Sequence, residues 1–322
     1  MAKAKRKKVQ YTTPELIAQI NPQNKELWKK YLNGKRQLAE SSKNSYTSDI
    51  NQFFVFILKN YDNKYIFDFE TEDMADLIED FLALCQSVFE NKDRRMQRRL
   101  SSISSLYLYY KKKRKIKENV VDLLERPKVQ KGVYEIKRVF LTQEQVSQIR
   151  EGLAQINNTQ LTLVFELGLF TMARVNAISS IRIDQIDFEN RVIRDVIEKE
   201  GYSITFNLND RCIELIKQWL DERKEKGIEC EYLFVTNYNG WRQASVGQFK
   251  STWIKQIGAI IDEPELSMHD LRHSGSDLRY KAGMSLEAVS KALSHRSTGV
   301  TKDFYLQEDT ESLKQEMLKF DI

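Results

Sequence analysis

Hydrophobic residues recur three and four positions apart along most of this chain, a pattern typical of amphipathic helices. Three such runs stand out early, at residues 27–57, 73–88 and 100–110. Their apolar and aromatic side chains need no role beyond a helical core. The basic stretch 126–139 interrupts the pattern with proline and glycine, as interdomain linkers do. We therefore expect an all-helical domain over residues 24–125.

Beyond the linker, over residues 140–322, helical and β patterns are mixed. An apolar run at 161–169 predicts a buried central helix, and residues 251–260 predict another helix. Residues 191–197 and 203–208 have the pattern of two hairpin strands, with a lysine, Lys199, near the tip between them. The second domain is therefore expected to combine helices with a small sheet.

Local signals mark further element boundaries in the second domain. Thr142 is a candidate N-cap with Gln145 in the capping-box position, and Ser267 stands in the same relation to Asp270. Residues 232–235, Tyr-Leu-Phe-Val, predict a short strand. The predicted fold class is mainly α: an all-helical N-terminal domain plus a mixed α+β domain with a small antiparallel sheet.

Composition excludes several classes of protein. With 41% hydrophobic residues the 322-residue chain can form real cores, so it is not a disordered protein. Its three cysteines are scattered and indicate neither a disulfide framework nor a zinc site, which fits a cytoplasmic location. We find neither a signal-peptide pattern nor an apolar run of membrane-spanning length. Residues 1–23 begin with a basic run and are expected to form a basic tail.

The third helical run carries an unusual charge pattern. Between residues 94 and 117 there are ten basic residues and no acidic one. Like charges at this density repel one another unless a polyanion neutralises them, and a nucleic-acid backbone is such a polyanion. A solvated helix face is the alternative, but the four serines at 101–105 would suit close approach to a groove. The candidate DNA-binding residues are Arg94, Arg95, Arg98, Arg99, Lys111, Lys112, Lys113 and Arg114.

All three histidines of the chain, His269, His273 and His295, lie in one short stretch. His269 and His273 are four residues apart on a predicted helix, which is the spacing of a zinc metalloprotease motif. That motif needs glutamate directly after the first histidine, where this chain has Asp270, and Arg272 would oppose a dication. A metal site is therefore the weaker interpretation, and no nucleotide-binding motif is present either.

Arginines, histidines, a lysine and a tyrosine suit phosphodiester chemistry better. Arginine forks bind the non-bridging oxygens of a phosphodiester, whose charge grows in an in-line transition state. A tyrosine hydroxyl attacks phosphorus once a base has taken its proton, and the phosphotyrosine then conserves the bond energy. A lysine can protonate the leaving 5′-oxygen. Such a site needs no metal and no other cofactor.

Several short motifs together resemble the tyrosine recombinase, or phage integrase, family. His269-Asp-Leu-Arg272-His, then Leu-Ser-His295 and then Tyr305, are similar to the C-terminal box of that family. Thr-Met-Ala-Arg174 resembles its first arginine box, and the hairpin lysine matches its catalytic lysine. Residues 24–125 resemble its DNA-binding core-binding domain and 140–322 its catalytic domain with a C-terminal tail helix, so the similarity covers nearly the whole chain.

The resemblance implies a site-specific DNA recombinase that works through a 3′-phosphotyrosine. Tyr305 would be the nucleophile, and Arg174 and Arg272 would bind the scissile phosphate. Lys199 would be the general acid toward the 5′-hydroxyl. His269 would assist as acid or base near the tyrosine.

The resemblance also assigns the other two histidines and an assembly. His295 would donate a hydrogen bond to the phosphate, and His273 would be structural. Family members act as four protomers on two DNA sites, so a homotetramer on double-stranded DNA is expected, with the C-terminal segment packing in trans on a neighbouring protomer. The short N-terminus implies a simple two-domain layout, and integration or excision of a mobile element is the expected task.

Three positions depart from the family pattern. Ala177 replaces the acid that usually stands three residues after the first arginine. Met172 and Ser294 each replace a glycine, so the support of Arg174 or Lys199 is expected to differ. Two other functions stay open: a type IB topoisomerase, which shares the chemistry but acts as a monomer, and a non-catalytic DNA-binding regulator on the same scaffold.

Overall fold

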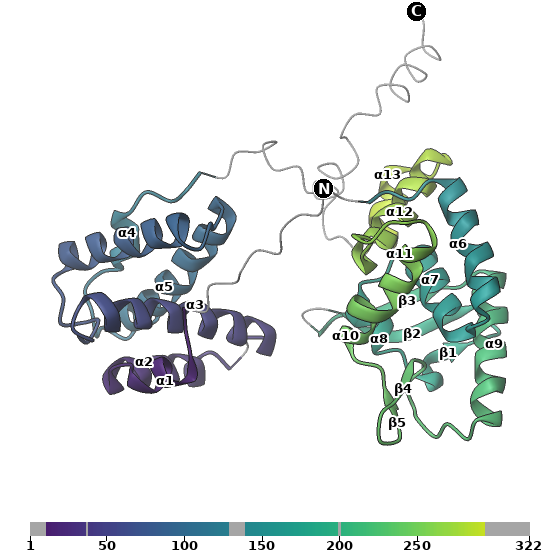
Figure 1. Cartoon of the computed structure of the whole chain (residues 1–322), viewed down its shortest axis with the longest axis horizontal. Coiled ribbons are helices and arrows are strands. Elements are labelled where there is room, and N and C mark those ends of the chain that lie inside the picture. The colour runs from purple at the N-terminus through teal and green to yellow at the C-terminus, as the bar shows by residue number, and fades with distance from the viewer. Residues whose placement is uncertain (1–10, 37, 129–138, 199–200, 294–322) are drawn as a thin grey trace, which may run out of the picture. The chain divides into compact units, whose positions relative to one another are not determined.

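The computed structural model describes residues 11–36, 38–128, 139–198 and 201–293 (Figure 1). The chain divides into two compact units, Met1–Glu135 and Ile136–Ile322. Each unit has a hydrophobic core of its own, and no residue belongs to both cores. The expected linker falls at this division, but most of it lies outside the described residues.

The described part of the first unit is helical. Its elements are α1 (Pro14–Gln19), α2 (Pro22–Gly34), α3 (Glu40–Asn60), α4 (Thr71–Ser87), α5 (Asp93–Lys112) and the 3-10 turn η1 (Val120–Leu123). The rings of Phe53 on α3 and Phe81 on α4 lie 5.3 Å apart, edge to face. The hydroxyl of Tyr110 on α5 donates to the Leu27 carbonyl of α2 at 2.8 Å. The predicted helical core of this unit is thereby confirmed.

The chain becomes helical earlier than its hydrophobic pattern indicated. Helix α1 lies inside the range 1–23, which was expected to be a tail, and Ile20 is buried in the core. Pro14 and Pro22 both stand at the first helical position, where a missing N–H is tolerated and a fixed φ favours the helix. Any basic tail is therefore shorter than predicted; residues 1–10 lie outside the described residues.

Helix α7 (Thr159–Thr171) is the centre of the second unit. Its side chains are apolar and buried on almost every side, as expected of a helix surrounded by other elements. It packs against α9 (Asp210–Glu225) and α12 (Met268–Lys281). The other helices in the described part of this unit are α6 (Gln143–Ile156), α8 (Val175–Ser179), α10 (Val246–Gln248), α11 (Ile254–Ile260) and α13 (Leu286–Ala292), with the 3-10 turn η2 (Ile183–Gln185) and the π-helical turn η4 (Phe249–Trp253).

The predicted capping boxes are both present. Thr142 accepts a hydrogen bond from the Gln145 amide, and the Gln145 side chain accepts from the Thr142 amide. Ser267 and Asp270 make the same reciprocal pair at the start of α12. These bonds satisfy amides that have no partner within the helix, and they fix where α6 and α12 begin.

A three-stranded antiparallel sheet lies beside the helices in the order β1 (Ile186–Asp187), β2 (Val192–Ile197) and β3 (Ser203–Asn207). The predicted hairpin is therefore confirmed as β2 and β3. A separate hairpin pairs β4 (Val235–Asn237) with β5 (Trp241–Gln243). The strand predicted at 232–235 is displaced, because β4 begins three residues later, at Val235. Tyr232 makes only an isolated bridge to Arg182.

The helix predicted from residue 251 begins earlier, at Val246, where Ser245 caps α10. The chain then passes through the π-helical turn η4 before α11. None of the helices in the described part of the chain is long and apolar enough to cross a membrane.

Candidate functional site

Arg272 joins three elements of the second unit. It lies on the second turn of α12, and its side chain is almost completely buried. Nη1 donates to the Met172 carbonyl at the end of α7, and Nη2 donates to the Leu293 carbonyl after α13, both at 2.6 Å. Hydrogen bonds from a charged donor are strong, so Arg272 fixes where both segments lie relative to α12.

Arg174 lies two residues beyond the carbonyl that Arg272 binds. It is the residue before the first turn of α8, and its side chain is 38% exposed. Its Nη1 is ion-paired with Oε2 of Glu198, the residue directly after β2. Two arginines that are nearly a hundred residues apart in sequence are thus connected through the Met172 backbone.

Met172 explains how the chain reverses between α7 and α8. It is the C-cap of α7 and has a left-handed backbone with φ +53°, a conformation that favours glycine. A non-glycine residue there costs about 1–3 kcal/mol. The Met172 side chain is buried with Val289 and Leu293, and this packing opposes the strain. The departure from glycine noted in the sequence therefore adds an apolar contact between α7 and α13.

The two described histidines lie one turn apart on α12. His269 is exposed, and its ring meets that of His273 edge to face with centroids 4.3 Å apart. His273 is buried, and its ring centroid lies 6.1 Å from that of Phe140. These positions suit a reacting role for His269 better than for His273. Within the described ranges no three metal-ligating side chains converge.

Three of the candidate catalytic residues, Lys199, His295 and Tyr305, lie outside the described residues. The structure therefore brings together Arg174, Arg272 and the α12 turn that carries His269. Glu198 is the sequence neighbour of Lys199, and it was not singled out in the sequence. A signal for it existed: Ala177 leaves the first arginine without its usual acid, and Glu198 stands beside the lysine that the hairpin pattern identifies.

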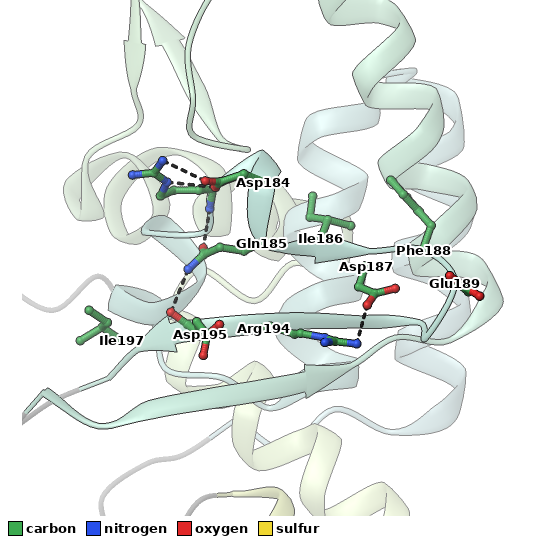
Figure 2. A pocket seen from close by; sticks show the side chains of 10 residues that line it. Asp184, Gln185, Ile186, Asp187, Phe188, Glu189, Arg194, Asp195 and Ile197 are labelled. Carbon is green, nitrogen blue, oxygen red and sulfur yellow. Dashed lines mark hydrogen bonds and ion pairs between the residues drawn. The ribbon is translucent and has the colours of Figure 1, made fainter.

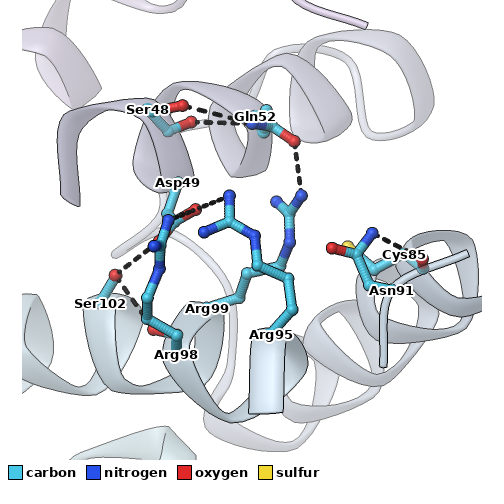
Figure 3. A network of polar contacts seen from close by, with 9 residues as sticks. All are labelled: Ser48, Asp49, Gln52, Cys85, Asn91, Arg95, Arg98, Arg99 and Ser102. Atoms are coloured by element: carbon cyan, nitrogen blue, oxygen red, sulfur yellow. Dashed lines mark hydrogen bonds and ion pairs between the residues drawn. The ribbon is translucent and has the colours of Figure 1, made fainter. Parts of the chain in front are cut away.

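A buried acid from another helix contacts the basic stretch on α5 (Figure 3). Asp49 of α3 is buried, and its carboxylate accepts from Arg95 at 2.6 Å and from Arg98 at 3.1 Å. The Ser102 hydroxyl also donates to it, at 3.3 Å. Burial raises the pKa of Asp49, against the opposing effects of Arg98 and Arg99. Residues 94–117 contain no acid in sequence, but α3 supplies one in space.

The candidate DNA-binding residues consequently differ in exposure. Arg99 is only 3% exposed; it donates to the Gln52 side chain at 2.7 Å, and its guanidinium lies over the Phe81 ring. It belongs to the core of the first unit, where its guanidinium also lies over the Phe89 ring. Of the serines between the two basic groups, Ser102 and Ser104 are buried as well. The exposed members of the set are Arg94, Arg98, Lys111, Lys112, Lys113 and Arg114.

A surface pocket of about 900 Å³ lies along β1 and β2 (Figure 2). Its lining contains four acids, Asp184, Asp187, Glu189 and Asp195, against two arginines. A hydrogen bond from Arg182 lowers the pKa of Asp184, and the Asn190 amide lowers that of Asp187. Both carboxylates stay ionised at neutral pH, so these two acids oppose the approach of a phosphate.

Comparisons with known proteins agree on one family. A model of the phage integrase family matches residues 139–312. A tyrosine recombinase of Thermosipho africanus (strain TCF52B) is 22% identical over 291 residues, covering 89% of this chain and 95% of that protein. Tyrosine recombinase XerC of Syntrophus aciditrophicus (strain SB) is 23% identical, covering 85% of this chain and 90% of that protein.

Solved structures share the fold at low identity. The XerH site-specific recombinase bound to its palindromic difH substrate superimposes with a TM-score of 0.67 at 17% identity, covering 92% of this chain and 85% of that one. A lambda integrase tetramer bound to a Holliday junction gives a TM-score of 0.61 at 18% identity, covering 87% of this chain and 76% of that one.

Proposed function

The chain belongs to the phage integrase family and is a tyrosine-type site-specific DNA recombinase, and from this premise we propose which of its residues carry the reaction. The six candidates are Arg174, Lys199, His269, Arg272, His295 and Tyr305, all within the matched range 139–312. The observation that carries the proposal is the hydrogen bond from Arg272 to the Met172 carbonyl, which ties α12 to the segment that presents Arg174.

The reaction exchanges one phosphodiester for another. The Tyr305 oxygen forms a bond to phosphorus while the bond from phosphorus to the 5′-oxygen breaks. The tyrosine proton passes to a base, for which His269 is the described candidate, and Lys199 gives a proton to the departing 5′-oxygen. Attack by a 5′-hydroxyl of the other duplex on the 3′-phosphotyrosine reverses these transfers and joins the exchanged strand.

The arginines stabilise the negative charge that grows on the phosphate oxygens. Arg272 reaches the site already oriented, because two backbone carbonyls fix the plane of its guanidinium. Donors held in place before the reaction need no reorganisation when charge develops, and each such donor typically contributes 10²–10³-fold to the rate. His295 would add a further donor, and residues of the α5 surface would hold the duplex through its backbone.

We extend the proposal to assembly and biological role. Four protomers would act on two DNA sites, with the C-terminal segment of each packing on a neighbour. The lambda integrase tetramer on a Holliday junction, which shares the fold, supports this assembly. Integration or excision of a mobile element is the proposed task. Sizing the complex on its mapped DNA site tests the assembly, because four protomers on two sites are expected, whereas a single protomer per site would contradict it.

Trapping of the covalent intermediate tests the proposed chemistry. The purified chain is mixed with sheared genomic DNA of its source, denatured in detergent, and the DNA that precipitates with protein is sequenced. The wild-type chain is expected to yield adducts at one or a few sites, and Tyr305→Phe none, because it lacks the attacking oxygen. Equal numbers of adducts from the two proteins would show that Tyr305 is not the nucleophile.

A further inference from the structure

Glu198 contacts the arginine that the proposed function assigns to the scissile phosphate. We propose that Glu198 is the positioning residue that holds Arg174 for catalysis, in place of the acid that Ala177 lacks. The inference rests on the proposed role of Arg174. It concerns an ion pair between two described residues, Nη1 of Arg174 at the N-cap of α8 and Oε2 of Glu198 directly after β2.

Burial shows that Glu198 needs this partner. Its side chain is only 6% exposed, whereas that of Arg174 is 38% exposed. A buried carboxylate is strongly destabilising unless a cation or several donors compensate it. Its second oxygen, Oε1, is buried without a hydrogen-bond partner among the described residues, so the guanidinium carries much of the compensation. The pair therefore constrains Arg174 as strongly as it constrains Glu198.

The backbone of Glu198 is fixed as well. Its amide donates to the Tyr202 carbonyl at 2.8 Å, and its own carbonyl accepts from the Gly201 amide at 3.1 Å. Gly201 has φ +80°, which glycine adopts without strain. These bonds close the hairpin directly after Ile197, the last residue of β2. The carboxylate is thus held by backbone bonds directly after β2, and small shifts of Arg174 are resisted from the sheet side.

Position 177 explains why the hairpin supplies the acid. Ala177 is three residues beyond Arg174, and its amide donates to the Arg174 carbonyl at 2.9 Å within the first turn of α8. Arg174 is the N-cap of α8 and Ala177 its third helical position, from which an acidic side chain would reach back toward the arginine. Alanine has no group that can do this, and Glu198 makes the contact from β2 instead.

The contact leaves Arg174 able to bind a phosphate. A guanidinium has five N–H donors in a planar fork, and the Glu198 contact engages Nη1. More than a third of the side chain is still exposed. One edge of the fork is therefore held by Glu198 while the rest stays open to the substrate. On this geometry Glu198 orients the arginine and does not compete with the phosphate for it.

The test asks whether Glu198 positions Arg174, merely supports the fold, or competes with the phosphate for the arginine. A suicide duplex carrying the site mapped from the covalent adducts is cleaved with protein in excess, and the adduct-forming rate and the DNA dissociation constant are measured separately. Glu198→Gln keeps the shape and removes the charge. We expect it to slow cleavage about tenfold to a hundredfold, as misplaced catalytic groups do, with DNA affinity changed less than about threefold. Glu198→Asp should retain more of the rate than Glu198→Gln.

A double-mutant cycle shows whether Glu198 acts through Arg174. In an Arg174→Lys background the Glu198→Gln change should have much less effect on the rate, because the fork that it orients is gone. Glu189→Gln, which removes the same charge from the exposed β1–β2 turn, is the matched control and should leave the rate unchanged.

Several results would overturn the inference. Faster cleavage or tighter DNA binding by Glu198→Gln would make Glu198 a competitor of the phosphate. If Glu198→Gln slowed cleavage by the same factor in the Arg174→Lys background as in the wild-type chain, Glu198 would act through a group other than Arg174. If Glu189→Gln slowed cleavage as much as Glu198→Gln does, the change in net charge alone would explain the slower cleavage. Absence of adduct with the wild-type chain would instead refute the proposed function, and this inference with it.

Discussion

Asp49 makes the basic surface of the first unit weaker than the charge count of α5 implies. It occupies the guanidinium groups of Arg95 and Arg98, whose side chains are 30% and 44% exposed. Arg99 is turned into the core. Figure 3 shows Arg95, Arg98 and Arg99 in this network, whereas Arg94, the fourth arginine at the start of α5, is exposed. The acid on α3 therefore limits how many phosphates this end of α5 can neutralise.

Replacement of Asp49 is expected to strengthen DNA binding. Asp49→Asn keeps a polar group of similar size and frees the charge of Arg95 and Arg98. The affinity for a duplex of arbitrary sequence should rise at low salt. The slope of log affinity against log salt should steepen by about one for each guanidinium that reaches a phosphate. Fluorescence anisotropy across a salt series measures both quantities.

A matched change on the exposed face of α4 provides the control for Asp49→Asn. Asp76→Asn removes the same charge from an exposed position. It should change affinity only slightly through the net charge, and it should leave the salt slope unaltered. If Asp49→Asn matches this control in slope, then Arg95 and Arg98 do not contact DNA, and the lysines at the other end of α5, about 24 Å away along the helix, become the main candidates.

At the scale of elements, the contact between α12 and the end of α7 determines where Arg272 lies. Gly275 stands one turn after Arg272, and a Cβ at that position would lie 2.1 Å from the Leu169 carbonyl oxygen. No side chain can move aside to relieve such a contact, because the obstacle is backbone. Glycine at this position is therefore a requirement of the helix packing that supports the site.

Gly275→Ala should lower both stability and cleavage. Forcing α12 away from α7 should reduce the free energy of unfolding by about 1–3 kcal/mol and lengthen the hydrogen bond from Arg272 to Met172. Urea unfolding and the adduct-forming rate measure the two effects. In Gly247→Ala the new methyl would meet only the Ser245 hydroxyl at 3.4 Å, so it should change stability by less than about 1 kcal/mol. A Gly275→Ala protein as stable and active as this control would contradict the packing argument.

The elements that could be predicted from sequence are those with local causes. Capping boxes act over three residues, the apolar periodicity of α5 reports which side is buried, and the continuous apolar run of α7 reports burial on every side. The β4–β5 hairpin was missed although Asn239-Gly240, a favoured turn pair, marks its tip. The short strands beside that pair gave too few alternating positions to register as a hairpin.

The contacts that escaped prediction depend on packing between distant elements. Asp49 meets the α5 arginines across nearly fifty residues, and Glu198 meets Arg174 from another element. Neither partner can be read from spacing, because the distance along the chain bears no fixed relation to the distance in space. The motifs identified the candidate residues Arg174 and Arg272, but not the contacts that hold them.

At the scale of the whole molecule, the two units have separate cores. The first is dominated by aromatic contacts between α2, α3, α4 and α5, and the second surrounds α7. A unit that buries its own apolar side chains can fold alone. Fragments 11–128 and 139–322 are therefore each expected to unfold cooperatively in isolation, which circular dichroism during heating would show. A fragment that lacks a cooperative transition would mean that its core is incomplete.

The two fragments also test whether both units hold the same duplex. If each unit contacts DNA, the covalent connection between the units makes the second contact intramolecular, with an effective concentration on the order of millimolar. The intact chain should then bind its mapped site about a hundredfold more tightly than either fragment, and an equimolar mixture of the fragments should not recover this gain. Its salt slope should approach the sum of the fragment slopes, because counterions are released from the phosphates at both contacts. An intact chain that binds no more tightly than fragment 139–322 would assign DNA recognition to the second unit alone, and the basic surface of α5 would then be a solvated face.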